Sequence, residues 1–548
     1  PPFFDGSIDQ KRIDDAVSRI LRTKFELGLF DNPYVSEEEI KTLQFNMNAH
    51  RQLALEAALK SIVLLKNENH VLPFDKKIKS IALIGEDAID ARLGGYSGPG
   101  NNKINILEGI KRELTKTSVK TVIYSPGPGI KSNEWKVVPA DYLLHLDNGK
   151  KEQGLKGAYF DNILLQGSSK IERIDNKIDF HWTFNSPANG IENDFYSIRW
   201  EGNLKSPITG NFKIGIDGDD GYRLYLNDSL VIDHWQKQTY STSLTNYHFE
   251  KNKEYKIKIE FFEPAANGEI KLIWNVNIAN DWRQKMTAAV NAAKKCDVAV
   301  VVAGIHEGEF QDRASLALPG HQEEVIRQIA ATGKPVVVVL VGGSAITMNS
   351  WLDKIPALID VWYPGEAGGT AIAKVLFGNY DPSGKLPITF PMSEAQLPLV
   401  YNHKPTGRGD DYYNLSGLPL YPFGYGLSYT TFNYSNLQLS KDSILKTDSA
   451  QVNFTLKNTG KVEGDEVVQL YIRDMVASVV RPVLELKGFQ RIHLKPGEAK
   501  NISFRITREM LSMLDLHLTK VVEPGEFRIM IGSSSRDLKL KTNLVVKE

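Results

Sequence analysis

Asp297-Val-Ala-Val-Val-Val-Ala303 leads directly into Gly304-Ile-His-Glu-Gly-Glu-Phe-Gln-Asp-Arg-Ala-Ser-Leu-Ala-Leu-Pro319, and this junction decides the fold. The first stretch is too apolar for an exposed strand and fits a strand that is buried on both faces, as in a parallel sheet. The polar segment therefore begins at the carboxyl end of a strand, where such sheets bind ligands. The sequence predicts a functional loop over residues 304–319.

Two carboxylates, Glu307 and Glu309, flank Gly308 on this loop. Asp312 and Arg313 follow closely enough to anchor the loop through a charge-assisted pair. The arrangement is a candidate acid/base site. The alternative is a solvated acidic loop without chemistry, because exposed carboxylates are common on protein surfaces.

Strand and helix patterns alternate on both sides of a long interruption. The apolar stretches are 62–65, 80–85, 121–124, 297–303, 335–342 and 357–363, and a helical pattern covers 322–330. Such alternation predicts an α/β sandwich with a largely parallel sheet covered by helices on both faces. Because neither side alone has enough strands to cover a core, we expect residues 51–150 and 278–401 to share one sheet.

The interruption, roughly residues 155–275, alternates apolar and polar residues at short intervals, which is typical of an antiparallel β-sandwich. Residues 431–548 show the same spacing and predict a second sandwich of fibronectin type III kind. Within the inserted part, Asp217, Asp219 and Asp220 offer enough oxygens for a calcium ion, but Asp and Gly also make tight turns. We predict no metal there.

Charge and hydropathy exclude several classes of function. Lys plus Arg and Asp plus Glu each number 66, so no net field favours nucleic acid or an anionic membrane, whereas a neutral sugar is compatible. No apolar run approaches the ~20 residues needed to span a bilayer. No cofactor motif is complete. The single cysteine, Cys296, excludes an intrachain disulfide and is expected to be a packed core residue.

The loop motif resembles a known family. Glu307-Gly-Glu-Phe-Gln-Asp-Arg313, with Leu318-Pro-Gly-His-Gln-Glu-Glu324 shortly after, is similar to the acid/base loop of glycoside hydrolase family 3. The resemblance places Glu309 on the catalytic acid/base. Phe310 and Gln311 stand where the family has Gly and an aromatic residue, so Glu307 is kept as the fallback.

Four further segments resemble the same family in the same order: 19–30, 61–67, 363–369 and 382–387. The resemblance implies the domain layout. Residues 1–34 are the last helix of the N-terminal (β/α)8 barrel and the start of a linker, and the remaining units are the sandwich's first segment 35–150, an insert 151–277, the second segment 278–405, a linker 406–430 and the fibronectin type III-like domain 431–548. It also implies that the aspartate nucleophile lies on barrel strands outside this sequence.

The insert resembles the protective-antigen-like module that some family 3 β-glucosidases carry at this place. The resemblance implies that the insert overhangs the active site and limits substrate length. The candidate sugar contacts are His306 and Phe310 on the loop and Tyr196 and Trp235 on the insert.

The implied function is that of a retaining, exo-acting β-glucosidase, of which this chain is the C-terminal part and alone is inactive. The alternatives are a β-xylosidase of the same family and a non-catalytic carbohydrate-binding or scaffold fragment. The expected partners are a β-linked oligosaccharide and the N-terminal barrel. We expect a periplasmic or secreted location, with a cytoplasmic location as the alternative. A homodimer is a further possible assembly.

Overall fold

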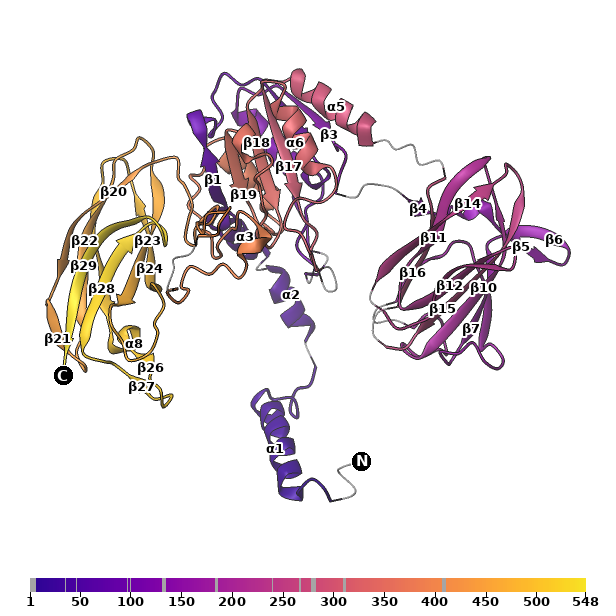
Figure 1. Cartoon of the computed structure of the whole chain (residues 1–548), viewed down its shortest axis with the longest axis horizontal. Helices are drawn as coiled ribbons and strands as arrows, with labels where there is room; N and C mark the ends of the chain where they lie inside the picture. The colour runs from indigo at the N-terminus through magenta and orange to yellow at the C-terminus, as the bar shows by residue number, and fades with distance from the viewer. Residues whose placement is uncertain are drawn as a thin grey trace.

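A computed structural model gives the conformation of most of the chain. It describes residues 6–34, 36–45, 47–95, 97–98, 100–130, 135–182, 186–238, 240–265, 268–276, 282–308, 312–406 and 411–548. Figure 1 shows an α/β domain and two β-sandwiches, with helix α1 at the N-terminal end.

The α/β domain is built on one six-stranded sheet to which both sides of the interruption contribute. Its order is β1 (Val63–Asn67), β19 (Ala357–Asp360), β18 (Val336–Val341), β17 (Val298–Gly304), β2 (Ser80–Ile84) and β3 (Thr121–Ser125). All neighbours run parallel except β1, which pairs antiparallel with β19. The predicted fold class, an α/β sandwich with a largely parallel sheet and two all-β units, is confirmed.

Helices cover both faces of this sheet. The helices α5 (Trp282–Lys294) and α6 (Gln322–Ala330) pack on the face that holds Ala299, Val301 and Ala303. The helices α3 (Met47–Ser61), α4 (Ile106–Glu113) and α7 (Gly368–Leu376) cover the face that holds Val298, Val300 and Val302. Alternate residues of β17 thus point into two cores, which is why the strand is apolar throughout.

Strand β19 ends earlier than the apolar pattern predicts. The pattern runs to residue 363, but the strand stops at Asp360. The Asp360 carboxylate accepts a hydrogen bond from the backbone N–H of Trp362 (3.1 Å), and Trp362 has a φ of +53°. A short side-chain acceptor thus competes with the sheet ladder and turns the chain out of the sheet.

The insert is a sandwich of two antiparallel sheets. The larger contains β13 (Ser229–His234), β12 (Gly221–Leu226), β15 (Glu254–Glu263), β10 (Tyr196–Lys205), β5 (Leu143–Asp147), β6 (Lys150–Gln153), β7 (Leu155–Phe160) and β8 (Ile171–Asp175). The smaller contains β14 (Ser241–Phe249), β11 (Gly210–Asp219), β16 (Glu269–Trp274), β4 (Lys136–Val137) and β9 (Asp179–His181). The predicted start at residue 151 is wrong, because β4 and β5 already belong to these sheets.

The C-terminal domain is a second sandwich. One sheet holds β20 (Phe432–Leu439), β22 (Ala450–Asn458) and β25 (Ala499–Ile506). The other holds β21 (Ser443–Leu445), β29 (Leu538–Lys547), β28 (Gly525–Gly532), β23 (Gly464–Asp474) and β24 (Glu485–Leu494). A short helix, α8 (Arg508–Leu511), and the two-stranded ribbon of β26 (Met513–Leu514) and β27 (Lys520–Val521) connect them.

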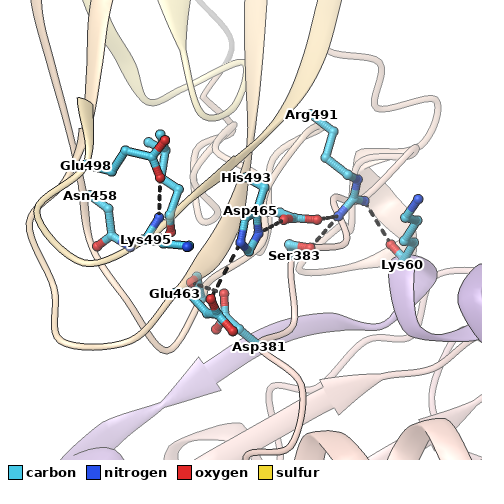
Figure 2. A network of polar contacts seen from close by, with 12 residues as sticks. Lys60, Asp381, Ser383, Asn458, Glu463, Asp465, Arg491, His493, Lys495 and Glu498 are labelled. Atoms are coloured by element: carbon cyan, nitrogen blue, oxygen red, sulfur yellow. Dashed lines mark hydrogen bonds and ion pairs between the residues drawn. The ribbon is translucent and has the colours of Figure 1, made fainter. Parts of the chain in front are cut away.

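Arg491 of β24 joins this domain to the α/β domain (Figure 2). Its guanidinium donates to the backbone carbonyl of Lys60 (3.1 Å) and to Ser383 Oγ, and it pairs with Asp465 (3.3 Å). Asp465 also accepts from His493 Nδ1 at 2.8 Å. The carbonyl of Lys60 lies in the last turn of α3, where carbonyls lack a helical partner, so Arg491 also caps that helix.

The N-terminal helix α1 (Gln10–Glu26) follows the amphipathic pattern of its sequence. Asp9 caps it by accepting from the N–H of Lys11 (3.1 Å), and Gly28 follows its end with a φ of +69°. Its apolar residues are largely exposed, including Ile20 (61%) and Phe25 (66%). A second helix, α2 (Glu37–Phe45), leads to α3.

Candidate active site

The carboxyl ends of the parallel strands β17, β18 and β19 meet at one edge of the sheet. The loop after β17 begins at Ile305, and it lies against residues 342–345 after β18 and residues 362–363 after β19. This edge is where open α/β sheets bind ligands. The sequence-based placement of the loop at a strand end is thus met in the structure.

The base of the loop is closed by Gln322 at the start of α6. Its buried side-chain amide accepts from the N–H of Gly304 (2.8 Å) and donates to the carbonyls of Gly304 (2.8 Å) and Pro319 (3.0 Å). Gly304 is required here, because a Cβ atom would lie 1.9 Å from the carbonyl oxygen of Val341. The two ends of the loop are therefore held together.

Glu307 anchors the first half of the loop to its neighbours. Its Oε2 accepts from the N–H of Gly343 (2.5 Å) and from the hydroxyl of Tyr363 (3.0 Å), and its Oε1 accepts from Ser344 Oγ. Both oxygens are therefore occupied by donors from the loops after β18 and β19. These contacts hold Glu307, and with it the first half of the loop, in place.

Arg313 anchors the second half of the loop at the same place. Its guanidinium donates to Ser344 Oγ (2.8 Å), so that Ser344 bridges Arg313 and Glu307. The prediction that Asp312 would pair with Arg313 is wrong: Arg313 turns inward to Ser344, whereas Asp312 is exposed. Arg313 nevertheless holds the loop, as predicted, through its hydrogen bond to Ser344.

Glu309 and Phe310, the predicted acid/base and one predicted sugar contact, lie outside the described residues, as does Gln311. The described residues on either side of them in the sequence are Gly308 and Asp312. His306, the other loop residue predicted to touch a sugar, is exposed.

Two residues that sequence reasoning missed support the start of the loop. Arg92 pairs with the buried carboxylate of Asp87 and donates to the carbonyl of Ile305. Burial raises the pKa of Asp87, and the positive charge of Arg92 opposes that rise. Neither residue lies in a recognisable motif; the only signal was that both follow the carboxyl end of the predicted strand 80–85.

Burial also shifts two titrating groups beside Glu307. It raises the pKa of Asp360 to about 7, and the negative charge of Glu307 adds to the rise. It raises the pKa of Tyr363 to about 12, assisted by the hydrogen bond to Glu307. Tyr363 therefore remains a donor at neutral pH, and the edge of the sheet holds a carboxyl group that titrates near neutrality.

The two aromatic residues predicted on the insert differ in exposure. Tyr196 is 1% exposed and belongs to the core between the two sheets, so the prediction that it touches a sugar is wrong. Its position on the inward face of β10, four residues before Trp200 on that same face, explains the burial. Trp235 is partly exposed, with its ring packed on Phe262 (centroids 4.7 Å apart) and under the guanidinium of Arg223 (4.6 Å).

Within the described part of the chain, no group of three or more His, Cys, Asp or Glu side chains is placed to hold a metal ion. In the Asp217–Asp220 turn, Asp217 accepts from Thr242 Oγ1 (2.8 Å) and Asp220 accepts from the N–H of Gln238 (2.9 Å). Among the described helices, none combines the length and the apolarity that a membrane crossing requires.

Comparison with known families decides the relationship. Residues 62–429 match the family described as "Glycosyl hydrolase family 3 C-terminal domain", which is more than half of the chain. The chain belongs to glycoside hydrolase family 3. Residues 466–535 of this family 3 chain match a fibronectin type III-like domain, in the C-terminal sandwich. The resemblance drawn from the loop motif is confirmed.

The individual relatives are named as two kinds of enzyme, β-xylosidase and β-glucosidase. The chain is 32% identical to a β-xylosidase of Formosa agariphila over 98% of its own length and 56% of the relative's. It is 30% identical to a periplasmic β-glucosidase of Salmonella typhimurium over 97% of its own length and 55% of the relative's. A solved β-glucosidase structure from Erythrobacter marinus aligns with a TM-score of 0.69 at 28% identity, covering all of this chain and 57% of that one. The chain thus spans little more than half the length of these relatives.

Proposed function

We propose that this chain is the part of an exo-acting retaining β-glycosidase that supplies the acid/base carboxyl group, Glu309. The observation that carries the proposal is the double anchoring of the loop at Glu307 and Arg313 through Ser344. Glu307 is occupied by three donors, whereas Glu309 stands in the sequence between the two anchors, Glu307 and Arg313. Glu309, rather than the fallback Glu307, is therefore the carboxyl group assigned to the reaction.

The chemistry assigned to Glu309 has two steps. It first gives its proton to the leaving oxygen, and it then takes a proton from the water that releases the sugar. In a retaining glycosidase the second carboxylate, the nucleophile, lies about 5 to 5.5 Å away across the scissile bond. We assign that group to an N-terminal barrel in the complete protein, in keeping with the length of the relatives.

The substrate is a β-linked glycoside with a free non-reducing end. A β-glucoside and a β-xyloside are both candidates, because relatives at nearly equal identity bear the two names. The two sugars differ by the hydroxymethyl group of glucose. A site that hydrogen-bonds this group rejects xylosides strongly, and one too small for it rejects glucosides.

We expect the complete protein to hydrolyse p-nitrophenyl β-glucoside or β-xyloside, with kcat/KM for one about 10-fold or more above the other, since one missing contact has at least that effect. The matched control is p-nitrophenyl α-glucoside, which should not react. Hydrolysis of neither β-glycoside by a folded complete protein would sink the enzymatic proposal and favour the non-catalytic carbohydrate-binding alternative.

We also propose that the inserted sandwich, of protective-antigen-like kind, limits the length of the substrate. We expect replacement of residues 135–276 by a short linker to leave the remainder folded, because the sheet and both its helical layers come from outside the insert. The variant should gain activity on tetrasaccharides relative to disaccharides, and the retained thermal transition of the α/β domain serves as its control. An unchanged ratio in a folded variant would contradict the proposed lid.

A further inference from the structure

A cleft of about 670 Å³ lies against the C-terminal sandwich, away from the candidate active site. One wall is the outer face of the neighbouring strands β23, β28 and β29, and the other is formed by residues from 398–406 and 411–423. Backbone hydrogen bonds fix this segment to the sandwich, from Val483 N–H to His403 (3.0 Å) and from Ser535 N–H to Phe423 (3.0 Å). The cleft is therefore part of the folded domain and not a gap between mobile pieces.

The charge of the lining is one-sided. Among the residues that the structure describes, five cations line the cleft: Lys404, Arg473, Arg528, Arg536 and Lys541. Asp411 is the only acidic residue of the described lining, and its Oδ1 is occupied by the N–H of Gly417 (2.7 Å) and by Ser416 Oγ (3.3 Å). The whole chain carries equal numbers of acidic and basic residues, so the excess is local.

The register of the strands makes this excess costly for the fold. Arg473 of β23 lies directly opposite Arg528 of β28, and Met530, two residues further on the same face, lies opposite Lys541 of β29. Like charges placed directly opposite in an antiparallel pair are destabilising. Across the described residues, none of the three cations Arg473, Arg528 and Lys541 has an ion pair that would relieve the repulsion. An arrangement that weakens the sheet in this way is typical of a binding site.

The floor of the cleft adds an apolar surface. Tyr401 stacks on Phe423 with ring centroids 4.1 Å apart, and Met530 and Leu538 line the same cleft. Rings and methylene groups pack against the C–H faces of sugars, while arginine guanidinium groups bind carboxylates through two parallel hydrogen bonds. From β23 to β29 the cations extend over two strand spacings, about 10 Å, so a ligand with several anionic groups can meet them together.

We propose that this cleft binds an acidic oligosaccharide, a chain of sugars that carries uronic acid carboxylates. The cations and the apolar floor carry the assignment of an anionic, ring-bearing ligand, and the choice of a glycan rests on the proposed glycosidase function. The site holds the acidic part of a polysaccharide while the neutral, terminal sugar is removed elsewhere.

The test is calorimetric titration of the complete protein with a hexamer of galacturonic acid. We expect binding that weakens as salt is raised from about 0.05 M to 0.3 M, because screening acts on the charge contacts. The double variant R473Q/R528Q should lose about 10-fold or more in affinity. The calorimetric affinity is measured without catalytic turnover, so absence of glycosidase activity would refute the proposed function without affecting the binding result.

Controls separate the alternatives. R505Q removes an arginine from β25 on the other sheet, where Arg505 donates to Ser449 Oγ (3.2 Å), and should bind as wild type does. The thermal midpoint of R473Q/R528Q should not fall below that of wild type, since a repulsive pair is removed. Unaltered hexamer binding by R473Q/R528Q would overturn the proposal. So would equal affinity for inorganic phosphate, tighter binding of duplex DNA, or no hexamer binding at low salt.

Discussion

Replacing Glu309 with alanine in the complete enzyme is expected to lower kcat/KM for an unactivated disaccharide about 10²- to 10⁴-fold, the range that general acid/base catalysis contributes. An aryl glycoside with a good leaving group should lose far less in the first step, because its leaving oxygen needs little protonation. The second step also loses its base, so the aryl substrate should show a burst followed by slow turnover. Steady-state and pre-steady-state kinetics on both substrates measure this difference.

Glu307→Ala is the matched control, because it removes the neighbouring carboxylate of the same loop. The variant loses the contacts to Gly343, Ser344 and Tyr363, so the loop is positioned less well and activity should fall. That loss should be the same for substrates with good and poor leaving groups, since no proton donor is removed. A leaving-group dependence in Glu307→Ala that is missing in Glu309→Ala would move the acid/base role to Glu307.

Asp360→Asn is expected to stabilise the protein above neutral pH and to leave it unchanged near pH 4. The folded-state pKa of Asp360, about 7, lies above the ordinary value of 3.8. Between these two values the folded protein keeps a proton that the unfolded chain has released, so the stability of wild type falls as the pH rises through this window. At about 1.4 kcal/mol per pH unit, the difference at pH 8 is on the order of 4 kcal/mol.

Urea unfolding of wild type and Asp360→Asn at several pH values measures this effect. The asparagine keeps the acceptor for the N–H of Trp362, so the turn after β19 is preserved. Asp297→Asn is the control of opposite sign: backbone hydrogen bonds from Lys79 and Ser80 lower the pKa of Asp297, so its contribution is present at neutral pH and lost as the pH falls. Equal pH dependence of wild type and Asp360→Asn would contradict the account of Asp360.

The sheet could be predicted because each of its strands is marked by an apolar pattern within its own short stretch of sequence. The run 298–303 is apolar at every position, as expected for a strand buried on both faces, and helix α6 coincides with the predicted residues 322–330. The loop could be placed for the same reason, since it follows that strand. The insert was recognisable from alternation, but β4, at two residues, is too short to show a period, and its place in the sheet is set by pairing with β16.

The contacts of the loop could not be predicted, because they join residues far apart in the sequence. The partners of Glu307 come from strand ends about 36 to 56 residues later, and their approach depends on the order of β17, β18 and β19 in the sheet. Asp312 and Arg313 are adjacent in the sequence, which suggested an ion pair, but the guanidinium of Arg313 instead donates a hydrogen bond to Ser344 Oγ. For Tyr196, an aromatic residue at alternate spacing did not reveal which face of β10 turns inward.

The most direct test of the assignment of Glu309 is the product that Glu309→Ala forms from an aryl β-glycoside in the presence of azide. Azide needs no deprotonation, so it should replace the water whose base has been removed, speed turnover and yield a glycosyl azide of β configuration, which proton NMR identifies. A β-glycosyl azide from Glu309→Ala and none from Glu307→Ala is the result expected. Formation of that azide by Glu307→Ala alone, with Glu309→Ala behaving as wild type, would contradict the account.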